Sequence, residues 1–282
     1  MNITIRELIE SDDEQANHLL NLAFHSSTNR LNDLHLYQKL QPDRWFTACI
    51  DGRLIGTVGA INYGAFAYIG FMTVHPELQG QGIGKLLMEH VLSWLENQSV
   101  PAVMLDATKS GFPLYKKLGF KTLDETSIFE IPGIDAKYEM PSSVQPITFN
   151  DLDELVQLDT PVFGADRRKV FHNLETLYPS RAFLHRDEKG KITGYLFAQN
   201  NRIGPWVMLD PGYEEELLKA ALTLAFVNPV SACVPSTNTQ AIDLLESYGF
   251  KKARAANHMI KGQGTVQCKR ENVFAQTSFG AG

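Results

Sequence analysis

The sequence predicts an α/β protein of the α+β type, built as two similar halves, each a mixed, mostly antiparallel, twisted sheet flanked by helices. Three observations lead to this prediction. The chain has 282 residues, which exceeds the usual size of a single domain. Short apolar segments of strand character are interspersed with amphipathic helical segments. The order of segments in residues 3–131 is repeated in residues 147–262, which indicates an internal duplication.

The first half opens with a short strand and two helices. Residues 3–8 are predicted as a strand, and residues 11–24 as a helix with Ser11 or Asp12 as its N-cap. A second helix covers residues 29–41. The β-rich segments 44–50, 54–64 and 65–76 follow, separated by the turns "DGR" and "YGA", so an antiparallel meander is expected.

A long helix follows the meander, and its apolar residues form one continuous helical face: Ile83, Leu86, Leu87, Val91, Trp94 and Leu95. The first half then ends with a strand at 100–108, a short helix at 112–119 and a further strand at 120–131. Because every segment has a clear period or a clear turn beside it, residues 1–135 are predicted to form the first domain.

Residues 132–146 contain three prolines, a glycine and two serines, so we predict a linker over 136–146. Residues 147–282 then form a second domain. Its predicted segments are a strand end and helix (147–159), a helix (166–179), a hairpin (181–199), a strand (204–211), a helix (214–226), a strand (230–237), a helix (239–250) and a strand (251–260).

Composition excludes several classes of protein. The formal net charge of -6 argues against a general polyanion binder, so no nucleic-acid partner is expected. Cys49, Cys233 and Cys268 are widely spaced and contain no CxxC pair, which indicates a reducing compartment and no metal site. No run approaches 18 apolar residues and the start has no apolar signal core. We therefore expect a soluble, cytoplasmic protein without a membrane partner.

The stretch "HPELQGQGIGKLL" places Gly80, Gly82 and Gly84 immediately before the long helix. Glycine near a helix start lowers helix propensity by up to about 1 kcal/mol per residue relative to alanine. In return, a backbone without Cβ atoms lets a phosphate approach the free amides and the positive end of the helix dipole. The loop therefore predicts a phosphate or pyrophosphate site, with an ordinary glycine-rich turn as the alternative.

Known phosphate loops of two other kinds fit poorly. No GxxxxGK[ST] string is present, and the loop follows a meander rather than the first strand of a βαβ unit. A flavin or nicotinamide enzyme is therefore not favoured. The loop instead resembles [QR]-x-x-G-x-[GA], the pyrophosphate loop of the GCN5-related N-acetyltransferase (GNAT) family, here with Gln79, Gly82 and Gly84. The whole of residues 3–131 resembles the family in element order, and Tyr115 in "YKKLGF" matches its second marker.

The resemblance implies a role for particular residues. The strand ending in "FMTVHP" would splay from the "MLDAT" strand and present backbone groups of Met72, Thr73 and Val74 to the pantetheine arm of acetyl-CoA. Tyr115 would both contact the donor and protonate the departing thiolate. The acceptor amine would attack the thioester directly. The residues implied to hold the pyrophosphate are Gln79, Gly80, Gln81, Gly82, Ile83, Gly84 and Lys85.

The sequence departs from the family at two places in this half. Many members carry an asparagine at the start of the short helix, where this chain has "DATKSGFPLY", so Thr108 or Ser110 would replace its contact to pantetheine. No glutamate lies on the fourth strand to act as a general base. Asp106 is the nearest acid, with a turn or helix-capping role as the alternative, and His75 is either a base or a loop residue.

The second half departs further. It lacks the glycine loop, and Leu245 stands where the first half has Tyr115, so it resembles the degenerate C-terminal domain of some two-domain acetyltransferases. The resemblance implies that it helps to form the acceptor pocket. Asp166 and Arg167 are candidates for binding the acceptor's ammonium and carboxylate, with a helix cap and a solvated arginine as alternatives. The aromatic tail from Phe274 to Phe279 either packs back or frays.

These features favour an acetyl-CoA-dependent N-acetyltransferase acting on the primary amine of a small or amino-acid-like molecule. Two alternatives remain open: a protein lysine or N-terminal acetyltransferase, and a sensor that binds acyl-CoA without turnover. Acetyl-CoA is the expected co-substrate, and no metal is expected. The chain is expected to be a monomer or a homodimer.

Overall fold

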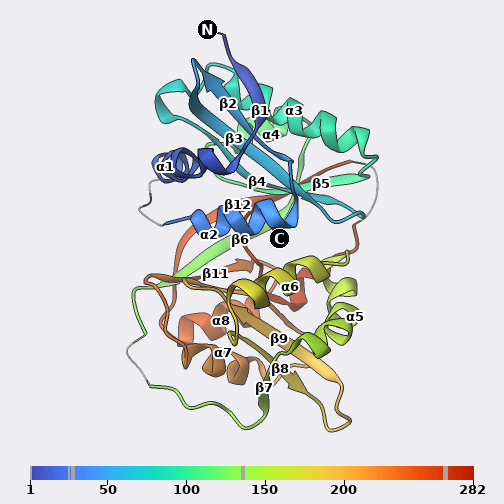
Figure 1. The fold of residues 1–282 in the computed structure, drawn as a ribbon. Coiled ribbons are helices and arrows are strands. Elements are labelled where there is room, and N and C mark those ends of the chain that lie inside the picture. Colours follow the sequence, from blue (N-terminus) through green and yellow to red (C-terminus); the bar gives the residue numbers. More distant parts are fainter. Residues whose placement is uncertain (1, 25, 27–28, 135–136, 263–265) are drawn as a thin grey trace. The chain divides into compact units, whose positions relative to one another are not determined.

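The computed structural model describes residues 2–24, 26, 29–134, 137–262 and 266–282 (Figure 1). The chain divides into two compact units. Unit 1 comprises Met1–Leu105, Pro113–Phe120 and Ile260–Gly264, and unit 2 comprises Asp106–Phe112, Lys121–Met259 and Thr265–Gly282. No helix in the described ranges has the length and apolar character needed to cross a membrane.

Unit 1 contains an open sheet in the order β1-β2-β3-β4-β5, with the end of β12 beyond β5. The first four strands pair antiparallel, and β4 pairs parallel with β5. The elements are β1 (Thr4–Glu7), α1 (Asp13–Phe24), α2 (Leu31–Leu40), β2 (Trp45–Ile50), β3 (Arg53–Asn62), β4 (Ala67–Val74), α3 (Ile83–Asn97), β5 (Ala102–Ala107) and α4 (Phe112–Lys117).

Helices cover both faces of the unit 1 sheet, and two glycines of β3 show which helix covers which face (Figure 1). A Cβ at Gly59 would run into the ring of Trp45, whose indole N–H bonds the Tyr37 carbonyl of α2. A Cβ at Gly56 would instead meet Leu87 of α3. Because side chains alternate along a strand, α2 and α3 lie on opposite faces.

Unit 2 has a sheet in the order β12-β6-β11-β10-β9-β8-β7, and β13 pairs with β10. Its elements are β6 (Lys121–Ile131), β7 (Val144–Pro146), α5 (Leu152–Phe163), α6 (Arg168–Leu177), β8 (Ala182–Arg186), β9 (Ile192–Ala198), β10 (Arg202–Met208), α7 (Glu214–Leu222), β11 (Val230–Pro235), α8 (Thr239–Ser247), β12 (Lys251–Gly262) and β13 (Val273–Ala275). Of these, β10 and β11 form a parallel pair, like β4 and β5 in unit 1.

Alternation along β9 assigns the helices of unit 2 to their faces. Tyr195 and Phe197 contact the ring of Phe171 in α6. Leu196 and Ala198 belong to the apolar core that includes Leu217 of α7 and residues of α8. The second unit therefore repeats the layered plan of the first, and the predicted α+β tandem fold is confirmed.

The structure differs from the sequence prediction at two places. Residues 144–146, assigned to the linker, form β7, which pairs with β8. Residues 121–131, assigned to the first domain, form β6, which pairs with β11 in unit 2. Of the two alternatives for the aromatic tail from Phe274 to Phe279, the structure shows packing: the tail overlaps β13, residues 274–278 are buried and Phe279 is half-buried. Residues 135 and 136, at the predicted domain boundary, lie outside the described ranges.

Candidate active site

The strand β4 contains a bulge at Phe71. This residue has a positive φ of 50°, and the register between β3 and β4 shifts beside it. The Thr57 hydroxyl donates to the Phe71 carbonyl at 2.7 Å, and the Phe71 ring stacks on Tyr37 with centroids 4.6 Å apart. A bulge bends its strand and increases the local twist, so β4 changes direction at this point.

As a result, β4 and β5 part. They pair only at Ala67–Val103 and Tyr68–Met104. Beyond Tyr68, β4 stays paired with β3 on one side and has no strand partner on the other side within the described residues. The predicted donor-binding residues Met72, Thr73 and Val74 lie on this free edge. The buried Thr73 hydroxyl also has no hydrogen-bond partner in the described structure.

The glycine loop follows β4 and leads directly into α3. Gly80 and Gly82 have φ values of 77° and 86°, and a Cβ at either would point into open space. Gly82 is the N-cap of α3, and no side chain caps the helix there. The first intrahelical hydrogen bond runs from the Leu86 N–H to the Gly82 carbonyl, at 3.1 Å. The amides of Ile83, Gly84 and Lys85 therefore have no intrahelical acceptor, which leaves them available to an anion.

Side chains of the loop support its backbone. The Gln79 amide donates to the Val74 carbonyl at 3.1 Å, which ties the loop to the end of β4, and Gln81 donates to the Glu77 carbonyl. Lys85 forms an ion pair with Glu89, and both side chains are exposed. No acidic residue lies in the first turn of α3, so nothing in that turn opposes an approaching phosphate.

Gly84 allows α4 to pack close to the loop. A Cβ there would lie 3.1 Å from Met72 and 3.4 Å from Leu114. The next residue, Tyr115, is 7% exposed and contacts the Phe120 ring edge-on. Burial raises the pKa of Tyr115 above its ordinary value, so the phenol stays protonated. Unit 1 thus brings the β4 edge, the glycine loop and Tyr115 together.

Comparison with known proteins assigns the family. Residues 9–120 match the model "Acetyltransferase (GNAT) family", and residues 155–275 match the model "Acetyltransferase (GNAT) domain". The chain belongs to the GNAT family. It is a tandem GNAT protein, and the family implies an acyl-CoA donor.

Several known proteins are similar to this chain over most of its length. The uncharacterized N-acetyltransferase YitH of Bacillus subtilis is 25% identical over 88% of this chain and 89% of the relative. Holothin acyltransferase of a Pseudoalteromonas species is 24% identical over 83% of this chain and 80% of that protein. A putative acetyltransferase of Pyrococcus horikoshii superposes with a TM-score of 0.87 and 22% identity, covering 99% of this chain and 96% of the other.

The residues at the asparagine position of other GNAT proteins form a polar turn before α4. The Thr108 hydroxyl lies 3.1 Å from that of Ser110, and the Thr108 carbonyl accepts from the Gly111 and Phe112 amides. Both residues group with unit 2, whereas the glycine loop and Tyr115 belong to unit 1. Their predicted contact to the donor therefore stays a prediction.

Asp106 is neither a turn nor a capping residue of the GNAT fold here. Its carboxylate is fully buried and accepts from Thr126 at 2.9 Å, from His258 Nδ1 at 3.2 Å and from Gln276 at 3.4 Å. The Arg270 guanidinium also donates to Thr126. This network was not visible in the sequence, because its members are up to 170 residues apart. It engages Asp106 in the interior of unit 2.

Arg167 lies in the core of unit 2, contrary to the expectation of a surface or ligand-binding side chain. It is 1% exposed, pairs with Asp159 through two hydrogen bonds of 2.7 Å, and donates to Tyr195 and Thr277. These contacts use the hydrogen-bond donors of Arg167 within unit 2, so we do not place Arg167 at the binding site of the acceptor molecule. Asp166 is exposed, lies one residue before Arg167, which is the N-cap of α6, and accepts from the Arg168 amide at 2.7 Å.

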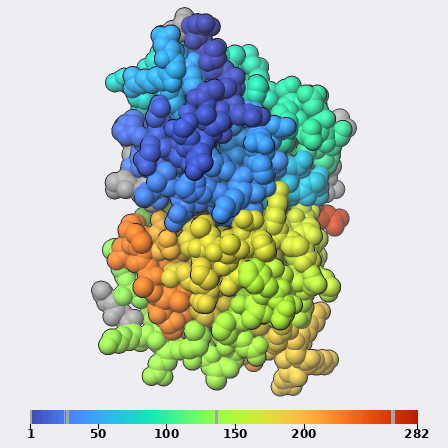
Figure 2. All heavy atoms as spheres, viewed as in Figure 1, coloured from blue at the N-terminus to red at the C-terminus, as the bar shows by residue number. Residues whose placement is uncertain are grey.

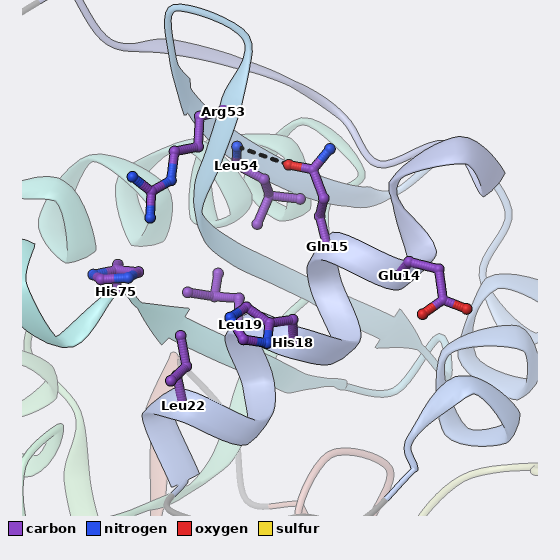
Figure 3. A pocket seen from close by; sticks show the side chains of 8 residues that line it. All are labelled: Glu14, Gln15, His18, Leu19, Leu22, Arg53, Leu54 and His75. Atoms are coloured by element: carbon purple, nitrogen blue, oxygen red, sulfur yellow. Dashed lines mark hydrogen bonds between the residues drawn. The ribbon is translucent and has the colours of Figure 1, made fainter.

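A cavity of about 260 Å³ lies on the α1 side of unit 1 (Figure 3). Leu19, Leu22 and Leu54 supply apolar walls, while Arg53 and His75 lie toward one end. The buried Nδ1 of His75 has no hydrogen-bond partner among the described residues. His75 lines this cavity, and no motif in the sequence pointed to the other lining residues.

Proposed function

We propose that this GNAT protein transfers the acetyl group of acetyl-CoA to a primary amine of a small acceptor, with the donor held by unit 1. The observation that carries the proposal is the parting of β4 from β5 at the Phe71 bulge, directly before a glycine loop that exposes helix amides. A free strand edge can form hydrogen bonds with the amides of a pantetheine arm. The N-terminus of α3 suits the pyrophosphate of the same CoA molecule.

The residues of unit 1 fit this donor on an observation independent of the family. Open space lies where Cβ atoms of Gly80 and Gly82 would be, so a phosphate can approach their backbone. The α3 first turn carries no acid, whereas the corresponding turn of α7 in unit 2 carries Glu214, Glu215 and Glu216. This contrast favours a donor site in unit 1 alone.

The chemistry assigns one proton transfer to Tyr115. The acceptor nitrogen forms a bond to the thioester carbon, the carbon–sulfur bond breaks, and the thiolate takes the phenolic proton of Tyr115. The nitrogen gives one proton to solvent to become the amide nitrogen, and Tyr115 regains a proton from solvent, so that the phenol is restored and no net proton is gained or lost. A neutral phenol can protonate a thiolate. Burial raises the pKa of Tyr115, so the phenol is still protonated when the CoA thiolate leaves.

A small acceptor is the simplest substrate class for this chain. The relative named holothin acyltransferase aligns over more than three quarters of both chains. Its name specifies a single compound as its substrate. We extend only the reaction class to this protein, N-acylation of an amine, and leave the acceptor to be identified by assay.

The test is calorimetric titration with acetyl-CoA, together with measurement of CoA release over a panel of amines. We expect one acetyl-CoA per chain and turnover with at least one amine. Gly82→Val should weaken binding by about tenfold or more, ~1.4 kcal/mol, because the added side chain occupies the phosphate approach.

Gly64→Val is the matched control. Gly64 has a φ of 84°, close to the 86° of Gly82, and its Cβ position is equally open. Both variants therefore carry the same backbone cost, but only Gly82 lies at the proposed donor site. Equal binding by both variants and the wild type would overturn the donor site, and binding without turnover on any amine would replace the enzyme by a sensor.

A further inference from the structure

The parallel strands β10 and β11 of unit 2 part in the same way as β4 and β5. They pair only at Arg202–Ser231 and Ile203–Ala232. The register of β10 against β9 then shifts between Ile203 and Trp206. In unit 1 the corresponding gap is the proposed donor cleft, so the contents of the gap in unit 2 decide whether that unit keeps a donor cleft of its own.

A strand of the same chain fills this gap. In β13, Ala275 pairs with Trp206 and Val273 with Val207, antiparallel to β10. The next residue, Gln276, forms a bridge to Cys233 of β11, and its amide donates to the Cys233 carbonyl at 2.8 Å. Since β10 carries β9 on its other edge and β11 carries β6 on its other edge, residues 273–276 lie between the two parted strands.

The walls of the gap are shaped for a strand. A Cβ at Gly204 would lie 2.1 Å from the Gln276 carbonyl oxygen, so only glycine allows this approach. The buried Asn238 amide donates to the Val273 carbonyl at 3.1 Å, and Gln199 donates to the Thr277 carbonyl at 3.0 Å. Side chains of unit 2 thus add hydrogen bonds to the main chain of the inserted segment and of the residue after it.

The inserted segment is buried along its length. Phe274 packs on Trp206 with ring centroids 4.8 Å apart, and Ala275 and Thr277 are at most 1% exposed. Figure 2 shows only a small patch in the red of the C-terminal residues on the face that is in view. Burial of this extent with main-chain pairing on both sides is how a strand-binding cleft holds its ligand.

We infer that the cleft between β10 and β11 is a binding site for an extended peptide, filled in this chain by residues 273–276. Its ligand class is a β-strand with a large apolar residue followed by a small one, as in Phe274 and Ala275. The same cleft cannot hold a pantetheine arm while the strand is in place. This site is separate from the proposed donor site and does not depend on acyl transfer.

The direct test cuts the covalent connection between the inserted strand and the rest of unit 2. A protease cleavage sequence is inserted after Gln267, which is exposed and lies outside the helices and strands. After cleavage, the nicked protein is titrated with a fluorescent peptide of residues 271–282, in competition with the resident fragment. We expect saturable exchange of the labelled peptide into the cleft and displacement by unlabelled peptide.

Peptide variants make the test specific. A peptide carrying Ala275→Asp should bind about tenfold or more weakly, because its carboxylate would be buried without a partner. A peptide carrying Glu271→Gln changes an exposed residue and should bind like the original. Equal binding of the Ala275→Asp peptide, or loss of the fragment without any rebinding of the peptide, would overturn the inference.

A second experiment uses the intact chain. Gly204→Ala should expel the Gln276 carbonyl and accelerate hydrogen exchange about tenfold or more in residues 203–208 and 272–278. Gly212→Ala is the matched control, because Gly212 also has a positive φ, 119° against 136°, but open space at its Cβ position. Unchanged exchange in Gly204→Ala, or the same acceleration in both variants, contradicts a filled cleft at this position.

Discussion

A phenylalanine, Phe71, holds a backbone conformation that L-residues rarely adopt, at the point where β4 leaves β5. Such a conformation costs about 1–3 kcal/mol and persists only where its surroundings enforce it. Here the Thr57 hydroxyl holds the Phe71 carbonyl, and the ring packs between Tyr37 and Trp45. The strain is thus fixed by the core, and its result is a strand edge free for a donor.

Tyr115 carries a residue-scale prediction about catalysis. Tyr115→Phe should lower kcat by about a hundredfold while leaving acetyl-CoA affinity unchanged, because only the proton donor is removed. Burial raises the pKa of Tyr115, so any activity loss from its ionisation should appear only above pH 10. Steady-state rates from pH 6 to 10 and calorimetric affinities check this.

Tyr248→Phe is the control for Tyr115→Phe. It removes a phenol of unit 2 that donates to Glu215, outside the proposed site. We expect wild-type kcat for this variant. A kcat for Tyr115→Phe within twofold of the wild type would remove Tyr115 from the reaction.

Arg167 carries a prediction about stability. Arg167→Met leaves the Asp159 carboxylate, 1% exposed, without its cationic partner and should destabilise unit 2 by about 3–5 kcal/mol. Arg168→Met removes an exposed pair with Asp153 and should change stability by less than about 1 kcal/mol. Urea titration with hydrogen exchange to locate the transition distinguishes them, and equal effects would mean that the buried pair contributes little.

At the scale of elements, the periodic pattern placed the long helices and strands but not the short strand β7. The apolar face from Ile83 to Leu95 gave α3, and the glycine cluster before it marked the loop, because both signals are local in the sequence. The bulge at Phe71 could not be predicted, since nothing in "YIGFMTV" distinguishes it from a regular strand. The Asp106 network and β7 were missed for the same reason: they depend on distant partners.

The bulge itself carries an element-scale prediction. Thr57→Val deletes the hydrogen bond to Phe71 and should cost about 1 kcal/mol or more, because a partly buried carbonyl loses its donor. Acetyl-CoA affinity should fall as well, since β4 is then free to straighten. Calorimetric titration and urea unfolding measure both quantities in the same sample.

Thr47→Val is the comparison for the bulge. Thr47 is also buried in the unit 1 sheet, and its hydroxyl donates to the Gly56 carbonyl at 3.0 Å. It should lose similar stability without a change in donor affinity. A parallel loss of affinity in both variants would show that general loosening of the sheet, not the bulge, controls binding.

The entry to α1 carries a prediction about acid stability. Arg6 donates two bonds to Asp12, at 2.6 and 2.8 Å, and thereby lowers the pKa of this carboxyl below its ordinary value. Because the folded protein holds the proton less tightly than the unfolded chain, this stabilisation is present above about pH 4 and is lost as the pH falls. Asp12→Asn should therefore flatten the decline of unit 1 stability between pH 5 and 3.

Urea midpoints across that range test the prediction, with Glu10→Gln, an exposed neighbour, as the control. The wild type and the control should lose stability together while Asp12→Asn changes less. Identical slopes for all three proteins would show that the Arg6–Asp12 pair does not link stability to pH.

For the whole molecule, the sequence predicted the duplication but not the exchange of strands between the two halves. Similar order of segments in both halves indicated a tandem fold, which the two family matches confirm. The sequence could not show that residues 121–131 pair with β11, or that residues 260–262 belong to unit 1. Strand pairing is a property of the assembled sheet, and apolar strands of similar length pair equally well by pattern.

This division predicts the behaviour of the first half expressed alone. Residues 1–135 lack the end of β12 that neighbours β5 and the β11 partner of β6. They should bind acetyl-CoA at least about tenfold more weakly than the full chain, or aggregate through unpaired strand edges. Gel filtration and calorimetry check this, and full-chain affinity in the fragment would contradict it.

The placement of β12 and β13 also determines when the two sheets can be completed during translation. In many multidomain proteins the N-terminal domain folds while the ribosome is still making the next one. Unit 1 includes residues 260–262, and the cleft of unit 2 closes with residues 273–276. Both units therefore need residues beyond 260 to complete their sheets, and a nascent chain of this protein carries two unfinished sheets until that stretch has left the ribosome.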